Sequence, residues 1–165
     1  MILALDLASS TGFAYSDDVG GIVRSGSVVF KGTPGEKFNS LYEWLESEVL
    51  TNRPTLISYE KPHFRGMSAT TLCVGLSAIV QMIATKYNIK TIGVASRTVK
   101  AFATGDRDAD KADMTAAAIS VTGKDLDVKA DNDQADAIHI ARWTAWALQN
   151  PEVLEKKPKK RKAKK

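Results

Sequence analysis

Apolar residues near the start of the chain form three short runs, at residues 2–7, 12–15 and 22–30. The segment SDDVGG separates the second run from the third, and Asp, Gly and Ser are residues that favour chain reversals. Short apolar runs bounded by such turns are typical of β-strands. The pattern therefore predicts three strands joined as a meander.

After this meander, the spacing of the apolar residues changes to the helical period. From Pro34, which suits a first helical turn, the residues Phe38, Leu41, Leu45 and Val49 recur at three- and four-residue intervals. The same reasoning predicts helices at residues 34–51, 68–87, 97–103, 110–121 and 131–149, and strands at residues 55–59 and 90–95. A meander followed by alternating helices and strands predicts an α/β protein with a mixed five-stranded sheet flanked by helices. This order of elements resembles that of the RNase H-like fold.

The length of 165 residues, with 44% hydrophobic and 25% charged residues, predicts one compact domain without a second lobe. The net charge of +4 is unevenly distributed, because eight Lys and Arg residues lie in residues 156–165 and the rest of the chain carries −4. We expect a folded domain over residues 1–150 and a disordered basic tail over residues 151–165, since the basic run has too little apolar surface to offset chain entropy. Nucleic acid is the polyanion that suits such a tail, and a solubilising role is the alternative.

Cysteine content and the N-terminal residues bear on the compartment. The single cysteine leaves no disulfide framework within the chain. No basic region precedes the first apolar run, and the uninterrupted apolar runs fall short of the roughly 20 residues of a membrane-spanning helix. We therefore expect a cytoplasmic protein that does not enter a membrane.

Two carboxylates stand at the ends of predicted strands. Asp6 ends the first apolar run, and Glu60 directly follows the strand at residues 55–59. An unpaired charge among apolar neighbours is costly to bury, so each carboxylate needs a partner or a cation. If both strands lie centrally in one sheet, the two carboxylates meet at its edge. For either residue taken alone, a cap or loop role is the alternative.

The last predicted helix begins with a concentration of acidic residues. At 100° per residue, Asp133, Asp136 and His139 spread over about a third of the helix circumference and share a face. Asp131, with Gln134 three residues later, resembles a capping box and is assigned a structural role. For Asp133 the alternative is simple stabilisation by the helix dipole. His139 is a candidate metal ligand or proton carrier, and a buried structural histidine is the alternative.

The four carboxylates offer oxygen ligands, which Mg²⁺ and Mn²⁺ prefer and zinc does not. Together, Asp6, Glu60, Asp133 and Asp136 would repel one another without a cation. With cations, such a cluster can hold two ions roughly 4 Å apart and support in-line phosphodiester displacement. We expect Mg²⁺ as the cofactor, with two ions per site and Mn²⁺ as a substitute.

Four motifs in this order resemble the RuvC family of Holliday junction resolvases, in the form carried by phages, within the RNase H-like nuclease superfamily. Residues 2–12 (ILALDLASSTG) resemble the family's first strand and turn, residues 57–60 (ISYE) its second acidic strand, and residues 133–137 (DQADA) its closing helix. The fourth motif is residues 97–100 (RTVK) with a lysine eleven residues later. The resemblance covers residues 1 to about 148 and implies that residues 1–150 are an RNase H-like nuclease domain. It implies that Asp6, Glu60, Asp133 and Asp136 are metal ligands and that Arg97, Lys100 and Lys111 hold the DNA backbone.

Further residues are candidates for contact with DNA or with a second copy of the chain. Phe64 and Arg65 follow the Glu60 strand in a predicted loop, where an exposed aromatic ring can insert at a branch point. Burial of Phe64 under the loop is the alternative, as plain solvation is for the lysines. The helix at residues 68–87 is apolar over a broad arc that includes Leu76 and Ile79, enough for both a core and a dimer face.

Taken together, the sequence predicts a homodimeric, Mg²⁺-dependent endonuclease that resolves four-way DNA junctions, or related branched DNA, by paired symmetric nicks. An RNase H-type nuclease acting on RNA–DNA hybrids is the nearest enzymatic alternative. An actin-like ATPase or kinase-type phosphate-binding domain belongs to a different class, and the chain has no second Gly-rich phosphate loop to support it. A non-catalytic DNA-binding module would leave the four acids unexplained.

Overall fold

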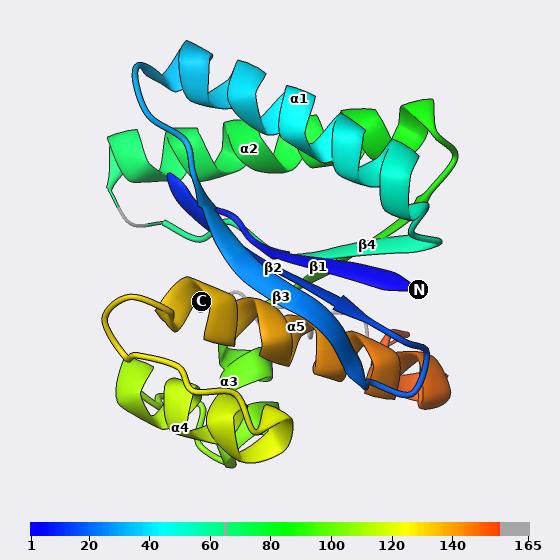
Figure 1. Ribbon diagram of the computed structural model, residues 1–165, viewed down its shortest axis with the longest axis vertical. Coiled ribbons are helices and arrows are strands. Elements are labelled where there is room, and N and C mark those ends of the chain that lie inside the picture. Colours follow the sequence, from blue (N-terminus) through cyan, green and yellow to red (C-terminus); the bar gives the residue numbers. More distant parts are fainter. Residues whose placement is uncertain (65, 156–165) are drawn as a thin grey trace, which may run out of the picture.

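The computed structural model describes residues 1–64 and 66–155 and has three layers. A central sheet is covered on one face by two helices and on the other by the last helix, against which two shorter helices pack (Figure 1). This architecture confirms the predicted α/β class. Arg65 and residues 156–165, which contain the basic run of the predicted tail, lie outside the described residues.

The sheet has the strand order β3-β2-β1-β4-β5. Its first three strands form the predicted antiparallel meander, and β4 and β5 continue it in parallel with β1. The strands are β1 (Ile2–Asp6), β2 (Ser10–Ser16), β3 (Ile22–Val29), β4 (Leu56–Glu60) and β5 (Lys90–Val94). β1 therefore lies at the centre of a mixed five-stranded sheet, with the end of β4 beside its own end.

The helices begin and end within two residues of the predicted positions. They are α1 (Pro34–Asn52), α2 (Met67–Lys86), α3 (Ser96–Thr104), α4 (Lys111–Thr122) and α5 (Asn132–Gln149), followed by a 3₁₀ turn at Pro151–Val153. The start of α1 shows why the prediction succeeded. Pro34 occupies its first turn, and Thr33 and Glu36 form a reciprocal capping box.

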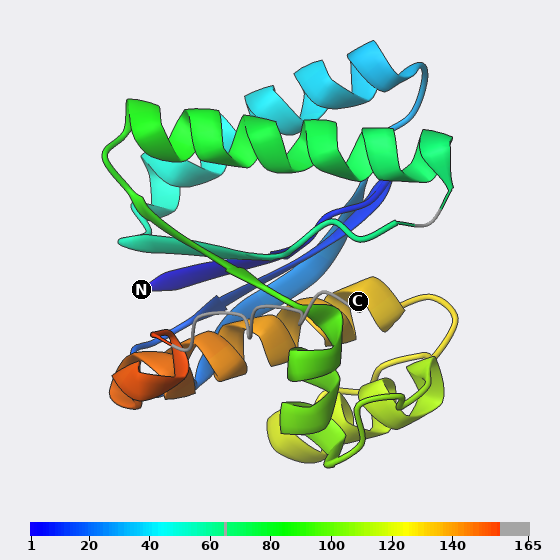
Figure 2. The same ribbon diagram turned by 180° about the vertical axis from the view of Figure 1, so that it is seen from behind.

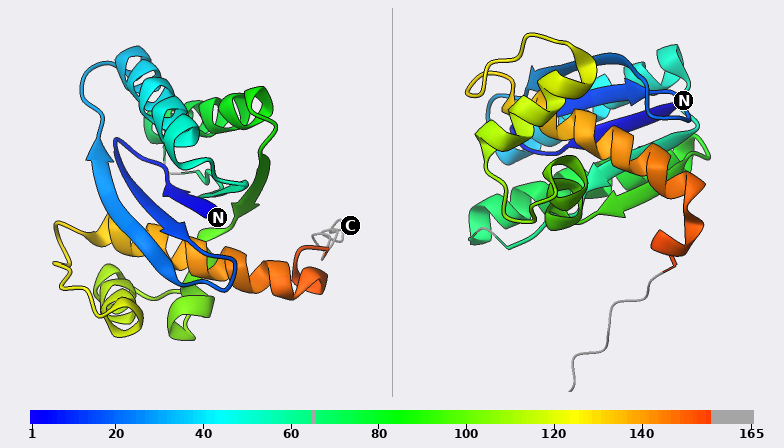
Figure 3. Two further views of the ribbon diagram at one scale, coloured as in Figure 1. Left: turned by 45° about the vertical axis from the view of Figure 1, so that its right-hand side comes forward. Right: turned by 90° about the horizontal axis from the view of Figure 1, so that it is seen from below.

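The two faces of the sheet carry different residues because side chains alternate along each strand. Leu3, Leu5 and Ile57 point to the layer of α1 and α2, where they are fully buried. Ala4 and Ala14 point to the other layer, where their small side chains leave room for α5. As a result α5 crosses the sheet closely and buries most of its own residues (Figure 3, right).

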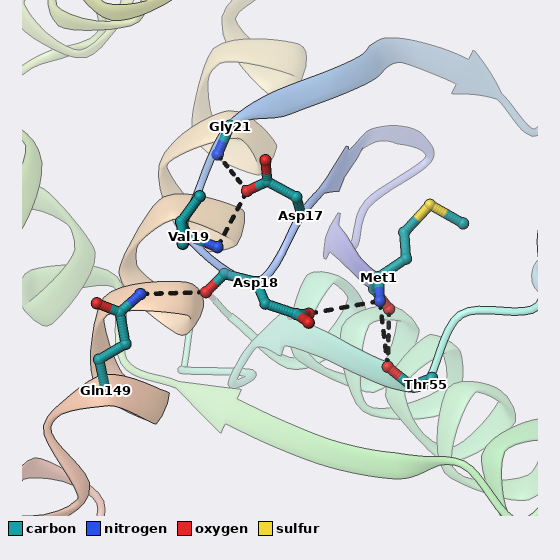
Figure 4. Close-up of polar contacts among 7 residues, drawn as sticks. All are labelled: Met1, Asp17, Asp18, Val19, Gly21, Thr55 and Gln149. Atoms are coloured by element: carbon teal, nitrogen blue, oxygen red, sulfur yellow. Dashed lines mark hydrogen bonds and ion pairs between the residues drawn. The ribbon is translucent and has the colours of Figure 1, made fainter.

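The carboxyl end of α5 is tied to the turn between β2 and β3 (Figure 4). The Asp17 carboxylate accepts hydrogen bonds from the backbone N–H groups of Val19 and Gly21, which shapes the turn. The Gln149 amide donates to the Asp18 carbonyl at 3.1 Å, and the Asp18 carboxylate lies 3.5 Å from the Met1 ammonium. These contacts hold α5 against the sheet at the end remote from Asp6.

The capping box predicted at the start of α5 is wrong. Asp131 is the N-cap residue, but its side chain makes no cap hydrogen bond. Its carboxylate instead accepts the backbone N–H of Asp127 at 2.9 Å, and the Gln134 amide donates to the Ser25 hydroxyl of β3. The preceding loop and the neighbouring strand therefore supply partners that outcompete the local motif.

Helix α2 is long and apolar enough to cross a membrane by length and composition, although its apolar residues do not form one uninterrupted run. In the structure it packs beside α1 over the sheet (Figures 1 and 2). Leu76, Val80 and Ile83 are fully buried in that contact, whereas Val74 and Met82 are half exposed. Leu76 therefore belongs to the core, and the exposed face of α2 is a different arc of the helix.

Candidate active-site cleft

A cleft of about 720 Å³ opens where β1 and β4 end. Its lining comes from five places: the end of β1, the end of β4 with the start of its following loop, one residue of α2, the α3–α4 segment, and the first turns of α5. All four predicted carboxylate ligands line it, as do the three predicted backbone-binding cations: Asp6, Glu60, Asp133, Asp136, Arg97, Lys100 and Lys111. The fold thus brings together residues that are up to 130 positions apart in sequence.

The four carboxylates are brought together by the pairing of β1 with β4 and by a close contact between β2 and the start of α5. β1 and β4 are parallel neighbours, so Asp6 and Glu60 end adjacent strands at the same edge of the sheet. On the other side of β1, Asp6 is paired with Gly12 of β2. A Cβ atom on Gly12 would overlap the Asp133 carbonyl, so only glycine lets the start of α5 approach this closely. Gly12 therefore determines how near Asp133 and Asp136 lie to the strand ends.

Burial and repulsion act on Asp136. Burial, together with the negative charges of Glu60 and Asp133, raises the pKa of this carboxyl group from 3.8 to about 6, and burial is the largest cause. The cations Lys100 and Lys111 oppose the shift. At neutral pH Asp136 is thus a charged group held in an environment that disfavours its charge.

This raised pKa predicts a stability effect. Because the folded state binds the Asp136 proton more tightly than the unfolded state, the contribution of this residue to stability falls as pH rises from about 4 to about 6. Asp136→Asn removes the charge, and we expect it to raise the free energy of unfolding by about 1–2 kcal/mol at pH 7.5 in EDTA. Urea unfolding of both proteins at pH 4.5 and 7.5 measures this. An equal difference between the proteins at both pH values would contradict it.

The cations on the α3–α4 side are held by their own contacts. The Lys100 ammonium donates to the Ala109 carbonyl at 2.6 Å, and Arg97 lies 3.2 Å from the Asp108 carboxylate. Lys111 is the first residue of α4, whose start is fixed by a reciprocal capping box between Asp110 and Asp113. The α3–α4 side of the cleft therefore presents positive charge to the carboxylates, from α3 and from the start of α4.

Several cleft residues were not predicted from the sequence. Lys61 and His63 follow Glu60, and Arg107 lies in the α3–α4 loop. The His63 ring nitrogen Nδ1 lies 3.4 Å from the Glu60 carboxylate. Cys73 of α2 also lines the cleft, and its thiol donates to the Leu7 carbonyl. For Lys61 and His63, their closeness to Glu60 in the sequence could have indicated a place in the cleft. The sequence holds no such signal for Arg107 or Cys73.

His139 lies away from the cleft lining. It is fully buried, and its Nε2 atom lies 2.9 Å from the Met114 carbonyl of α4. Burial lowers the pKa of this imidazole, which keeps it neutral. This position favours the alternative of a buried structural histidine that joins α5 to α4 over a ligand or proton carrier.

The loop residue Phe64 is 77% exposed, so the alternative of burial under the loop is wrong. An exposed phenylalanine next to a cleft is available for contact with a partner. The neighbouring candidate, Arg65, lies outside the described residues.

The donor chemistry of the cleft suits a hard divalent cation, because its lining includes the four predicted carboxylate ligands. A cation there would offset the burial and repulsion that raise the pKa of Asp136. The side chains do not form a ready-made cluster, since within residues 1–64 and 66–155 no three His, Cys, Asp or Glu residues make a group that could hold a metal ion. Metal binding therefore fits the residues by chemistry and by their shared cleft.

Comparison with known proteins shows the fold. No family model and no curated protein matches the sequence. Among solved structures, RuvC from Thermus thermophilus has a TM-score of 0.72 at 14% identity, over 91% of this chain and 96% of that one. T. thermophilus RuvC in complex with Holliday junction substrate has a TM-score of 0.76 at 14% identity, over 91% and 95%. The yeast mitochondrial Holliday junction resolvase Ydc2 has a TM-score of 0.64 at 15% identity, over 92% and 80%. The chain therefore has the fold of the RuvC Holliday junction resolvases, as the sequence predicted.

Proposed function

We propose that this protein is a metal-dependent endonuclease that resolves four-way DNA junctions. The observation that carries the proposal is the cleft, in which four carboxylates and three predicted phosphate-binding cations meet. The fold supports the same activity, because one similar structure is a RuvC in complex with Holliday junction substrate.

The carboxylates Asp6, Glu60, Asp133 and Asp136 would hold Mg²⁺, or Mn²⁺ in its place. Such ions, when bound, supply an activated water and stabilise the leaving oxygen in phosphodiester hydrolysis. The side chains of the protein would position the DNA. Lys100 and Lys111 face the carboxylates with positive charge and would hold the scissile phosphate against them.

The proposal is tested by one set of substrates. A labelled four-way junction, a linear duplex, a flap and an RNA–DNA hybrid are incubated with the protein in Mg²⁺ or in EDTA. We expect cleavage of the junction in Mg²⁺ alone. Cleavage of only the hybrid would replace the proposal with an RNase H-type activity, and ATP hydrolysis without DNA cleavage would replace it with a phosphate-binding ATPase.

The exposed Phe64 suits insertion at the branch point. Its ring is 77% exposed and it directly follows His63, a residue of the cleft lining. Apolar wedges unstack base steps in bent or branched DNA. We expect Phe64→Ala to lower junction cleavage about tenfold while the melting temperature stays within about 2 °C, because an exposed ring adds little to stability. Single-turnover cleavage and a thermal melt measure the two effects. Unchanged cleavage would remove the wedge and leave the nuclease proposal intact.

Paired nicking further requires two active sites, and we propose that a second copy docks on α2. The exposed face of this helix carries Met67, Val74 and Met82, and it has no charged residue before Lys86. This uncharged stripe exposes several apolar side chains, and a self-complementary contact on a two-fold axis would bury them.

A further inference from the structure

Lys61 is held in a fixed position at the end of β4. Its backbone N–H donates to the carbonyl of Val94, the last residue of β5, at 2.7 Å. This bond continues the pairing of β4 and β5 one residue beyond Glu60. Lys61 is therefore attached to the sheet edge beside the carboxylates and lines their cleft.

The side chain of Lys61 lies across Gly93 of β5. A Cβ atom on Gly93 would stand 2.9 Å from both Cγ and Cε of Lys61, closer than real side chains approach. Gly93 has no left-handed backbone conformation, so what its missing side chain provides is space for the Lys61 stem. The aliphatic stem of Lys61 thus lies along the sheet edge in the space that this glycine leaves.

The charge of Lys61 also differs from those of Arg97 and Lys100, two other cations of the cleft. Arg97 lies beside the Asp108 carboxylate and Lys100 donates to the Ala109 carbonyl. In the part of the chain that the structure describes, no hydrogen bond or ion pair involves the Lys61 ammonium. Lys61 also comes from the β4 side, whereas Arg97, Lys100 and Lys111 come from the α3–α4 side.

We propose that Lys61 binds a backbone phosphate of the DNA, so that the strand at the carboxylates lies between cations on both sides of the cleft. The inference rests on the proposed function and adds a contact on the β4 side. A lysine with a positioned stem loses less side-chain freedom when it binds phosphate than a free surface lysine does. Phosphate contacts of this kind set the register of DNA on a protein.

The first test compares two lysines in the full chain. Binding of a labelled four-way junction is measured by fluorescence anisotropy in EDTA across a series of salt concentrations. We expect Lys61→Gln to reduce the slope of log affinity against log salt by about 0.9, the value for one lost phosphate contact on duplex DNA. Lys90→Gln is the matched control, because Lys90 is exposed at the opposite end of β5, and we expect it to leave the slope unchanged.

The second test keeps the Lys61 charge but displaces its side chain. Gly93→Ala forces the Lys61 stem to shift, and we expect it to reduce the slope as Lys61→Gln does, with no further loss in the double variant. A thermal melt establishes that each variant is folded, and if Gly93→Ala is not, the Lys61→Gln result alone decides.

Equal slopes for Lys61→Gln, Lys90→Gln and the unaltered protein would overturn the inference. A lower slope for Lys61→Gln with an unaltered slope for folded Gly93→Ala would contradict the role given to Gly93. If the unaltered protein does not bind the junction at all, the proposed function fails instead, before any variant is compared.

Discussion

Replacing Asp6 with Asn, or Asp136 with Asn, is expected to abolish junction cleavage in Mg²⁺. Bound cations contribute several kcal/mol of charge stabilisation to phosphodiester hydrolysis, so loss of a ligand should lower the rate by roughly 10³-fold or more. Junction binding should persist or strengthen, because each variant removes a negative charge that faces the phosphates. Single-turnover cleavage and anisotropy on the same junction measure the two quantities.

Asp131→Asn is the matched control for these variants. Asp131 lies at the start of α5 like Asp133 and Asp136, but it is not among the residues that line the cleft. Its carboxylate accepts one backbone hydrogen bond, and an asparagine side-chain oxygen can accept the same bond. We expect near-normal cleavage from this variant. Near-normal cleavage by Asp6→Asn or Asp136→Asn would instead rule out the carboxylates as metal ligands.

The sequence predicted the positions of the carboxylates because simple geometry determines them. Once β1 and β4 are recognised as central strands, Asp6 and Glu60 must end at one edge of the sheet. The close contact of α5 with the strand ends was harder to predict from the sequence. It depends on Gly12, whose missing side chain leaves room for the Asp133 carbonyl, and that contact joins segments far apart in sequence.

Helical periodicity alone could not assign His139. A helical projection places Asp133, Asp136 and His139 on one arc, but it does not show which neighbour lies along each part of that arc. In the structure the arc is divided, since Asp136 lines the cleft and His139 is buried against the Met114 carbonyl of α4. The position of α4 depends on packing of the whole layer, which a local pattern does not contain.

Lys61 illustrates the same limit for charged residues. In the sequence it is one lysine among many, and solvation is the ordinary fate of such a side chain. Its significance comes from Gly93, which follows it by 32 positions and lies beside it through strand pairing. A sequence motif consists of residues close together along the chain, whereas Lys61 and Gly93 become neighbours only through the pairing of β4 with β5.

Charged residues on the exposed face of α2 are expected to separate the dimer and to convert paired cuts into single nicks. Val74 and Ala78 are exposed one helical turn apart, in the middle of the uncharged stripe. Leu76 is unsuitable for this purpose, because it is fully buried and a charge there would disrupt the core. Val74→Glu and Ala78→Glu place a charge at the proposed two-fold contact, where the partner copy presents the same charge.

Light scattering should give a dimer mass for the unaltered protein and a monomer mass for either variant. In a cruciform plasmid, the ratio of bilateral to single cuts should fall about tenfold or more, because one site acting alone cannot cut both strands within one binding event. Val121→Glu is the matched control, since Val121 is exposed on α4 in the opposite layer, and it should leave both mass and ratio unchanged. Circular dichroism establishes that all variants are folded. A folded monomer that still makes paired cuts within one complex lifetime would show that symmetric cleavage does not depend on α2.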